Sequence, residues 1–265
     1  NVAPTYYSFN IGNVHVVTIK SINYRGGCHY EEEITEEDLR WLERDLSYVP
    51  KDRLVILNMH APGWNAMEPI DNILNAKRLE EILAPYDAHV FAGHTHFFEN
   101  VEVSPRLYQH NIGSACGAWW TSNICRDGSP NGYMVVTVDG KKLRWKYRSA
   151  NSKSDVQMRV YKPGEFRTQK DFIVANVWEW DPHCRVVWYE DGKYKGLMQR
   201  FVDNDEAFLR TKPRKHQLAK TGHLFRARPS SKKYRYIKVI FINRFGETFT
   251  WKWENRNNRP FLLDK

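Results

Sequence analysis

Cysteine is scarce in this chain of 265 residues. Its four cysteines (Cys28, Cys116, Cys125 and Cys184) are too few and too scattered for a framework of disulfide bonds. No two of them form the C-x-x-C pair that holds zinc in many small domains. We therefore interpret them as free or buried thiols, and a Cys116–Cys125 bridge stays open for an exported protein.

Long apolar runs, internal repeats and low-complexity tracts are also absent. Because a membrane-spanning helix needs roughly 18–20 apolar residues, we expect no membrane span. The chain opens on Asn1 without a signal peptide, so we interpret it as a processed product or as one that begins inside a domain. Hydrophobic residues make up 42% and charged residues 27%, which is typical of a soluble globular protein.

Charge is divided unevenly along the chain. Residues 1–150 contain 15 Lys and Arg against 18 Asp and Glu, a net charge of −3. Residues 151–265 contain 25 against 13, a net charge of +12. Such a basic half could meet nucleic acid, anionic lipid or acidic glycans. Because most of its basic residues are spread among strands, solvent-facing positions are the commoner explanation.

The first half of the sequence alternates strands and helices. Strands are predicted at residues 14–19, 54–57 and 88–92, and helices from Thr35 to Pro50 and from about Ile70 to Ala84. The strand at 54–57 is wholly apolar, as strands buried on both faces are, and we expect 88–92 to be the next buried strand. This order predicts a layered α/β domain, in which ligands gather beyond the carboxyl ends of strands.

From about residue 101 the pattern changes to strands alone. A hairpin is predicted around Asp139-Gly140, and short strands near 156–161, 171–178, 184–190, 194–201, 234–243 and 247–253. This spacing favours a β-sandwich. Residues 150–155 are small and polar, so we divide the chain into an α/β part, 1–150, and a β-rich accessory domain, 151–265.

Three histidines follow two of the apolar strands. His60 comes after the first, and Gly93-His94-Thr95-His96 after the second. In extended backbone, His94 and His96 would point the same way and could hold one ion, whereas a bent loop would direct them to two neighbouring ions. Imidazole nitrogen suits zinc, iron and manganese. Packing against Phe97 and Phe98 is the alternative, and we favour the metal site.

These segments resemble known motifs. Residues 90–96 resemble the last metal motif of the calcineurin-like metallophosphoesterases, and residues 57–62 resemble their preceding single-histidine motif. Residues 41–46 are similar to the helix that these enzymes place before it. Residues 115–120 and 127–133 resemble a bacterial branch with a dedicated C-terminal domain. The resemblance covers about residues 6–150, and residues 151–265 more weakly.

The resemblance implies a fold and a chemistry. The fold would be a layered α/β/β/α sandwich, of which residues 1–150 form the C-terminal part, followed by a C-terminal β-sandwich domain. His60 and His94 would bind one divalent ion and His96 a second, with manganese, zinc or iron as the metal and a carboxylate bridging the pair. Two such ions activate water for hydrolysis of a phosphate monoester or diester. The bacterial branch would imply export to the periplasm or beyond the cell.

The family's upstream motifs, D-x-H, G-D and G-N-H-[DE], are missing from this sequence. Asp181-Pro182-His183 has the letters of the first but lies long after residue 96, and Gly12-Asn13-Val14-His15 only approximates the last. We interpret both as structural. We therefore expect the upstream catalytic segment to be a separate chain, removed by processing, or outside this sequence, and this chain alone to be inactive.

Four further residues are candidates for substrate binding: Trp64, Asn65, Trp119 and Trp120. Aromatic and amide groups often orient a substrate beside a metal centre, and packing is an equally weighted interpretation. Our first hypothesis is a phosphoesterase with two metals. The alternative is a binding module whose basic β domain holds an anionic polymer or glycan, with nucleic acid a less favoured partner.

Overall fold

The computed structural model describes residues 5–67, 71–153 and 155–255. Its first sheet has the order β1-β2-β5-β6-β8-β7, in which β2, β5, β6 and β8 run parallel and the edge strands β1 and β7 run antiparallel to their neighbours. The strands are β1 (Tyr7–Ile11), β2 (Val14–Thr18), β5 (Leu54–Asn58), β6 (Asp87–Ala92), β7 (Glu99–Ser104) and β8 (Leu107–Asn111). The predicted α/β alternation is therefore confirmed for this mixed sheet.

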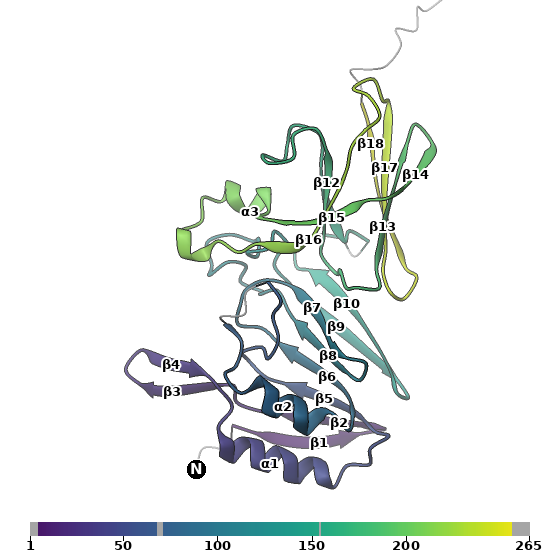
Figure 1. Ribbon diagram of the computed structural model, residues 1–265. Helices are drawn as coiled ribbons and strands as arrows, with labels where there is room; N and C mark the ends of the chain where they lie inside the picture. Colours follow the sequence, from purple (N-terminus) through teal and green to yellow (C-terminus); the bar gives the residue numbers. More distant parts are fainter. Residues whose placement is uncertain (1–4, 68–70, 154, 256–265) are drawn as a thin grey trace, which may run out of the picture.

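Two helices cover one face of this sheet, α1 (Glu36–Ser47) and α2 (Ala76–Leu83) (Figure 1). α1 begins where predicted, because the Thr35 hydroxyl accepts the Asp38 N–H at 3.2 Å and caps the helix. Leu39, Leu42 and Leu46 recur at helical spacing and are fully buried in the core beneath the sheet.

A hairpin covers the opposite face. It consists of β9 (Gly132–Asp139) and β10 (Lys142–Ser149), and the predicted turn lies between them. Leu143 and Trp145 of the hairpin pack with Leu54 and Phe91 of the sheet in one apolar cluster. Residues 5–67 and 71–149 therefore form three layers: helices, mixed sheet and hairpin (Figure 1).

The remaining strands form two antiparallel sheets of four strands, in the orders β11-β12-β16-β15 and β14-β13-β17-β18. Both contribute to one apolar core, with Val177 and Phe225 from the first and Trp188 and Ile237 from the second. The bounds are β11 (Met158–Tyr161), β12 (Ile173–Val177), β13 (Arg185–Glu190), β14 (Lys193–Leu197), β15 (Gln199–Asp203), β16 (Thr221–Ala227), β17 (Tyr236–Ile242) and β18 (Thr248–Glu254).

Three short elements complete the described chain. A hairpin of β3 (Ile22–Gly26) and β4 (His29–Glu32) projects from the sheet edge beside α1 and α2 (Figure 1). Helix α3 (Glu206–Arg210) and the 3-10 turn η2 (Lys215–Gln217) lie between β15 and β16. The expectation of strands alone after residue 101 was therefore wrong.

Three predicted or missing elements also differ from the sequence-based expectation. The second helix was expected from Ile70, which lies outside the described residues, but α2 begins at Ala76. The turn before it is held by Asn75, whose side chain bonds the backbone of Ile34 at both N–H and C=O. The predicted strand 194–201 is two strands, β14 and β15, and β16 was not predicted at all.

Hydrogen bonds between buried groups cross residue 150. The Tyr147 N–H donates to Glu179 at 2.9 Å, and the Gln157 amide donates to the Tyr147 carbonyl at 2.6 Å. The predicted linker, 150–155, includes Ser154, which lies outside the described residues. A division of the chain there stays a prediction. No helix in the described part of the chain is long and apolar enough to cross a membrane.

Candidate functional site

His60 and His94 meet at the carboxyl edge of the mixed sheet. β5 and β6 are parallel neighbours, so the loops that follow them leave the sheet side by side, and the Gly93 N–H bonds the His60 carbonyl at 3.0 Å. His60 Nε2 lies 3.1 Å from His94 Nδ1, with the ring centroids 4.9 Å apart. Burial lowers the pKa of His60 below its ordinary value, and nearby His94 and His96 lower it further.

Glu32 fixes the orientation of His94. The carboxylate Oε1, at the end of β4, lies 3.2 Å from His94 Nε2 and can only accept, so this nitrogen carries the proton. His94 Nδ1 then presents its lone pair toward His60. A carboxylate behind a histidine is the arrangement that commonly orients metal-binding imidazoles. Sequence reasoning missed Glu32, because it lies in a run of three glutamates, Glu31–Glu33, that carries no motif of its own.

His96 lies on the same loop but faces a different neighbour. Its Nδ1 donates to the Gly117 carbonyl at 2.6 Å, which leaves Nε2 as the nitrogen with a free lone pair. Its ring stacks on Trp119, with centroids 4.6 Å apart and an interplanar angle of 15°. The bent loop, and not extended backbone, is therefore the arrangement found. The turn falls on the histidines, with φ of 68° at His94 and 58° at His96.

Backbone strain is concentrated here. Six described non-glycine residues have positive φ: His94, His96, Trp119, Trp120, Asp191 and Lys212. The first four belong to the two loops that meet at His96. Each costs about 1 kcal/mol or more, because Cβ crowds the following carbonyl. Such strain persists only where the surroundings enforce it, and it is typical of functional sites.

The described residues do not assemble a complete metal centre. His60 and His94 offer two facing nitrogens, and His96 offers a third, set apart beside Trp119. Among the described residues there is no group of three or more His, Cys, Asp or Glu side chains placed to hold an ion. Metal binding by His60, His94 and His96 therefore stays a prediction.

The four candidates for substrate binding have different surroundings. Trp64 packs against the core under the helices, and its backbone N–H and carbonyl are both held by Gln109. Asn65 is buried, and no described residue hydrogen-bonds to either atom of its side-chain amide. Trp119 stacks on His96, and Trp120 beside it is 87% exposed. Packing is thus observed for Trp64, and substrate binding by all four residues stays a prediction.

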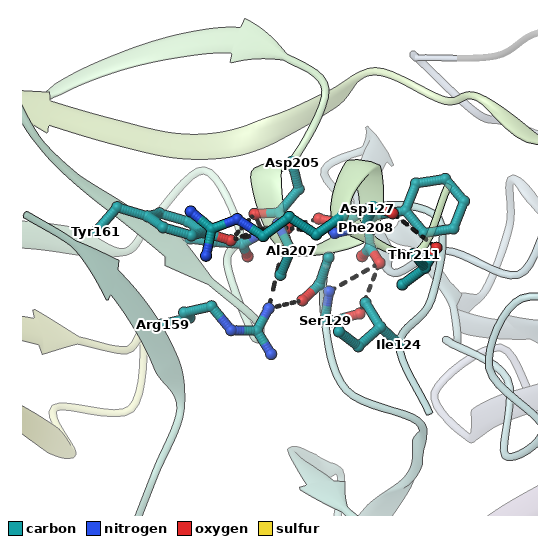
Figure 2. Close-up of polar contacts among 12 residues, drawn as sticks. Ile124, Asp127, Ser129, Arg159, Tyr161, Asp205, Ala207, Phe208 and Thr211 are labelled. Atoms are coloured by element: carbon teal, nitrogen blue, oxygen red, sulfur yellow. Dashed lines mark hydrogen bonds and ion pairs between the residues drawn. The ribbon is translucent and has the colours of Figure 1, made fainter. Parts of the chain in front are cut away.

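A buried network holds the loop behind this site, residues 125–131. Asp205 is fully buried and accepts hydrogen bonds from the Tyr161 hydroxyl at 2.8 and 2.9 Å and from the Ala207 N–H at 2.8 Å (Figure 2). Gly128 lies against it so closely that a Cβ would come within 2.0 Å of Asp205 Cγ. The loop is therefore fixed to the sheet of β11, β12, β15 and β16.

The two segments that only approximate the family's upstream motifs, 12–15 and 181–183, have structural contacts. His15 is buried, with Nε2 2.8 Å from an Asp45 oxygen, and it ties β2 to α1. His183 contacts Glu102 on β7 at 2.7 Å, and Asp181 accepts the His183 backbone N–H. Within the described chain, no contact joins either motif to His60, His94 or His96. All four cysteines are free thiols in the structure.

Comparison with known proteins gives two curated relatives. Probable purple acid phosphatase 20 of Arabidopsis thaliana is 27% identical over 186 residues, which cover 66% of this chain and 37% of the relative. Purple acid phosphatase 15 of the same plant is 28% identical over 138 residues, covering 49% and 23%. The matched stretches thus span less than two fifths of the length of the first relative and less than a quarter of the second.

Similar solved structures include a dimetal phosphatase from Danio rerio, at 15% identity and a TM-score of 0.36 over 41% of this chain and 48% of that one. GAP50, described as the anchor in the inner membrane complex of Plasmodium, gives 18% identity and a TM-score of 0.40 over 56% and 50%. Both likenesses are weak. Residues 109–249, more than half of the chain, match the family described as the C terminal of calcineurin-like phosphoesterase. The chain therefore belongs to the calcineurin-like phosphoesterases and resembles the purple acid phosphatases among them.

Proposed function

We propose that this chain supplies part of a phosphoesterase centre that hydrolyses a phosphate monoester or diester. The observation that carries the proposal is the contact between His60 and His94 at the carboxyl edge of β5 and β6, in a chain that belongs to this family. In the proposal, residues 1–150 are the C-terminal part of the layered catalytic sandwich, and residues 151–265 form the β-rich accessory domain.

The roles of the histidines follow from their partners. Glu32 holds the proton on His94 Nε2 and so presents Nδ1, and the Gly117 carbonyl holds the proton on His96 Nδ1 and so presents Nε2. Divalent ions bound there would supply activated water and neutralise the charge of the phosphate. The proposal assigns the carboxylate that bridges the two ions to a segment outside the described residues.

The first test uses the 265-residue chain itself. Zinc or manganese is expected to bind weakly, shifting the side-chain NMR signals of His60 and His94. His60→Ala should remove the shift at His94, whereas His183→Ala, at a histidine of the other half, should leave it unchanged. A shift that survives His60→Ala would contradict the assignment.

The second test measures metal-dependent hydrolysis of a chromogenic phosphodiester. A longer protein that carries the upstream motifs is expected to turn over, and His94→Ala in it should abolish turnover without unfolding it. The 265-residue chain alone should show negligible turnover, because three neutral imidazoles do little to offset the repulsion between two cations about 4 Å apart. Robust turnover by the chain, lost on chelation and in His94→Ala, would show that it holds a complete site.

A second candidate function is anion binding by the accessory half alone. A pocket of about 670 Å³ lies between residues 163–171 and 228–234, and Lys170, Arg228 and Lys232 line it. Its acidic member, Asp171, pairs with Arg228 at 2.7 Å. A sulfated or carboxylated oligosaccharide that binds the chain, with the affinity reduced by Lys170→Ala, would favour this candidate. Unchanged affinity in that variant would count against it.

A further inference from the structure

The segment between α3 and β16 is strongly basic. Residues 212–220, which we term the basic segment, contain Lys212, Arg214, Lys215 and Lys220 together with His216, and contain no acidic residue. All five side chains are exposed. None of them forms an ion pair with a described residue, so within the described chain the four positive charges of the segment face solvent without a counter-charge.

Arg126 fixes this segment to the histidine loop. Its guanidinium donates to the Gln217 carbonyl at 3.1 Å and to the Leu218 carbonyl at 3.4 Å. The same group donates to the Thr95 carbonyl at 3.1 Å, and the Arg126 backbone N–H donates to the His96 carbonyl at 2.9 Å. Because Arg126 is only 5% exposed, these contacts form a buried joint. The basic segment is therefore held next to the loop that carries His94 and His96.

An aromatic surface borders the same joint. The Arg126 guanidinium lies 5.4 Å from the centre of the Trp119 ring, whose own neighbour is the His96 ring. Trp119 is 40% and Trp120 is 87% exposed, although both have the positive φ that bulky residues rarely adopt. Lys212 at the start of the basic segment has a positive φ as well. Of the six described non-glycine residues with positive φ, five thus lie in three places: the loop of His94 and His96, the loop of Trp119 and Trp120, and the basic segment.

We propose that the basic segment and the two tryptophans select the substrate, and that the favoured class is a phosphate ester carrying both further phosphate groups and a flat ring, as nucleoside polyphosphates do. The exposed indoles offer faces on which a base can stack. The cations of the segment meet the additional phosphates. This inference rests on the proposed function, because the ester group is placed at the histidines.

The test is equilibrium binding to the 265-residue chain by calorimetry, with ATP, AMP and adenosine as probes. The expected order of affinity is ATP, then AMP, then adenosine. The triple variant Lys212→Ala, Arg214→Ala, Lys215→Ala should weaken ATP binding at least tenfold and leave adenosine unchanged. Trp120→Ala should weaken all three. The matched control is Lys142→Ala, Lys193→Ala, Lys252→Ala, which removes three exposed cations without an ion pair elsewhere and should change nothing.

Two results would overturn the inference: equal affinity for ATP and adenosine, or equal loss of ATP binding in the segment variant and the control. The readout also separates this inference from the proposed function. Suppose that the segment variant loses ATP binding, while the longer protein with the upstream motifs hydrolyses no ester. This result would uphold the selectivity and reject the phosphoesterase. Ester hydrolysis accompanied by equal affinity for the three probes would uphold the phosphoesterase and reject the selectivity.

Discussion

His223 on β16 and Asp127 in the loop before β9 are joined by a hydrogen bond of 2.9 Å between Nε2 and Oδ2, and both side chains are buried. Asp127 also accepts the Phe98 N–H at 2.8 Å and the Ser129 hydroxyl at 2.7 Å. Burial alone would raise the pKa of Asp127, but these donors outweigh it and hold the pKa below its ordinary value. The charge of Asp127 is therefore stabilised by groups from three different parts of the chain.

Asp127→Asn is expected to destabilise the protein by about 3 kcal/mol, because an amide N–H₂ would face one of the donors and the buried carboxylate that these donors satisfy would be lost. Since the pKa of Asp127 is lowered on folding, its contribution is present above the unfolded value of 3.8 and is lost as the pH falls through the folded value. Thermal denaturation at neutral and acid pH should show the difference from wild type shrinking in acid. Asp139→Asn, at an exposed turn, is the control and should have little effect.

Glu179 has the opposite pH dependence. Burial raises its pKa to about 7, although N–H groups of Tyr147 and Asn243 partly offset the shift. Stability from the protonated form is present below the unfolded value of 4.5 and is lost as the pH rises through 7. Glu179→Gln should therefore gain stability relative to wild type over that range, by at most about 3 kcal/mol.

The measurement is urea unfolding of wild type and Glu179→Gln at several values of pH between 4 and 8. An exposed acid without an ion pair, Glu37, provides the control, and Glu37→Gln should give a difference that does not change with pH over the upper part of this range. A Glu179→Gln difference that is flat from pH 4.5 to 7 would mean that Glu179 titrates normally.

Gly128 is expected to tolerate no other residue. Its φ is 82°, and an added Cβ would lie 2.0 Å from Cγ of Asp205, which Tyr161 and the α3 backbone hold in place. Gly128→Ala should cost at least about 3 kcal/mol from overpacking and strain together. Gly140→Ala has a φ of 61° but open space, so it should cost only about 1 kcal/mol. Equal melting temperatures for the two variants would contradict this account.

The division of the chain can be tested by limited trypsin digestion. We predict first cuts at residues 150–155 or within the basic segment, where exposed Lys and Arg side chains are accessible. Mass spectrometry of the early fragments identifies the cut. A chain that resists cleavage at both places would show that its two halves share one cooperative core.

The meeting of His60 and His94 could be predicted, because each follows an apolar strand and parallel strands end at one edge. Glu32 could not, since it reaches His94 only when the β3–β4 hairpin folds back toward the sheet. The bend at His94 and His96 was likewise hidden, because φ falls in the left-handed region at residues that do not signal it.

The strand β16 shows a different limit. Six of its seven residues are buried, so the alternation of polar and apolar residues that marks a half-exposed strand is missing. Its polar members find specific partners, such as Asp127 for His223. Asp127 lies 96 residues away from His223 in the sequence, and a local pattern carries no information about so distant a partner.

The hydrogen bonds that cross residue 150 also bear on how such a chain can be inherited. Asp127 depends on His223, its backbone carbonyl accepts the Asn176 amide at 2.8 Å, and Glu179 depends on Tyr147. A recombination event that joined residues 151–265 to an unrelated α/β layer would leave each of these buried groups without its hydrogen-bond partner. The stretch that matches the family, 109–249, includes all five residues. Gene exchange between relatives is therefore expected to transmit them together, with the breakpoint before Asp127 and not at the residues after β10.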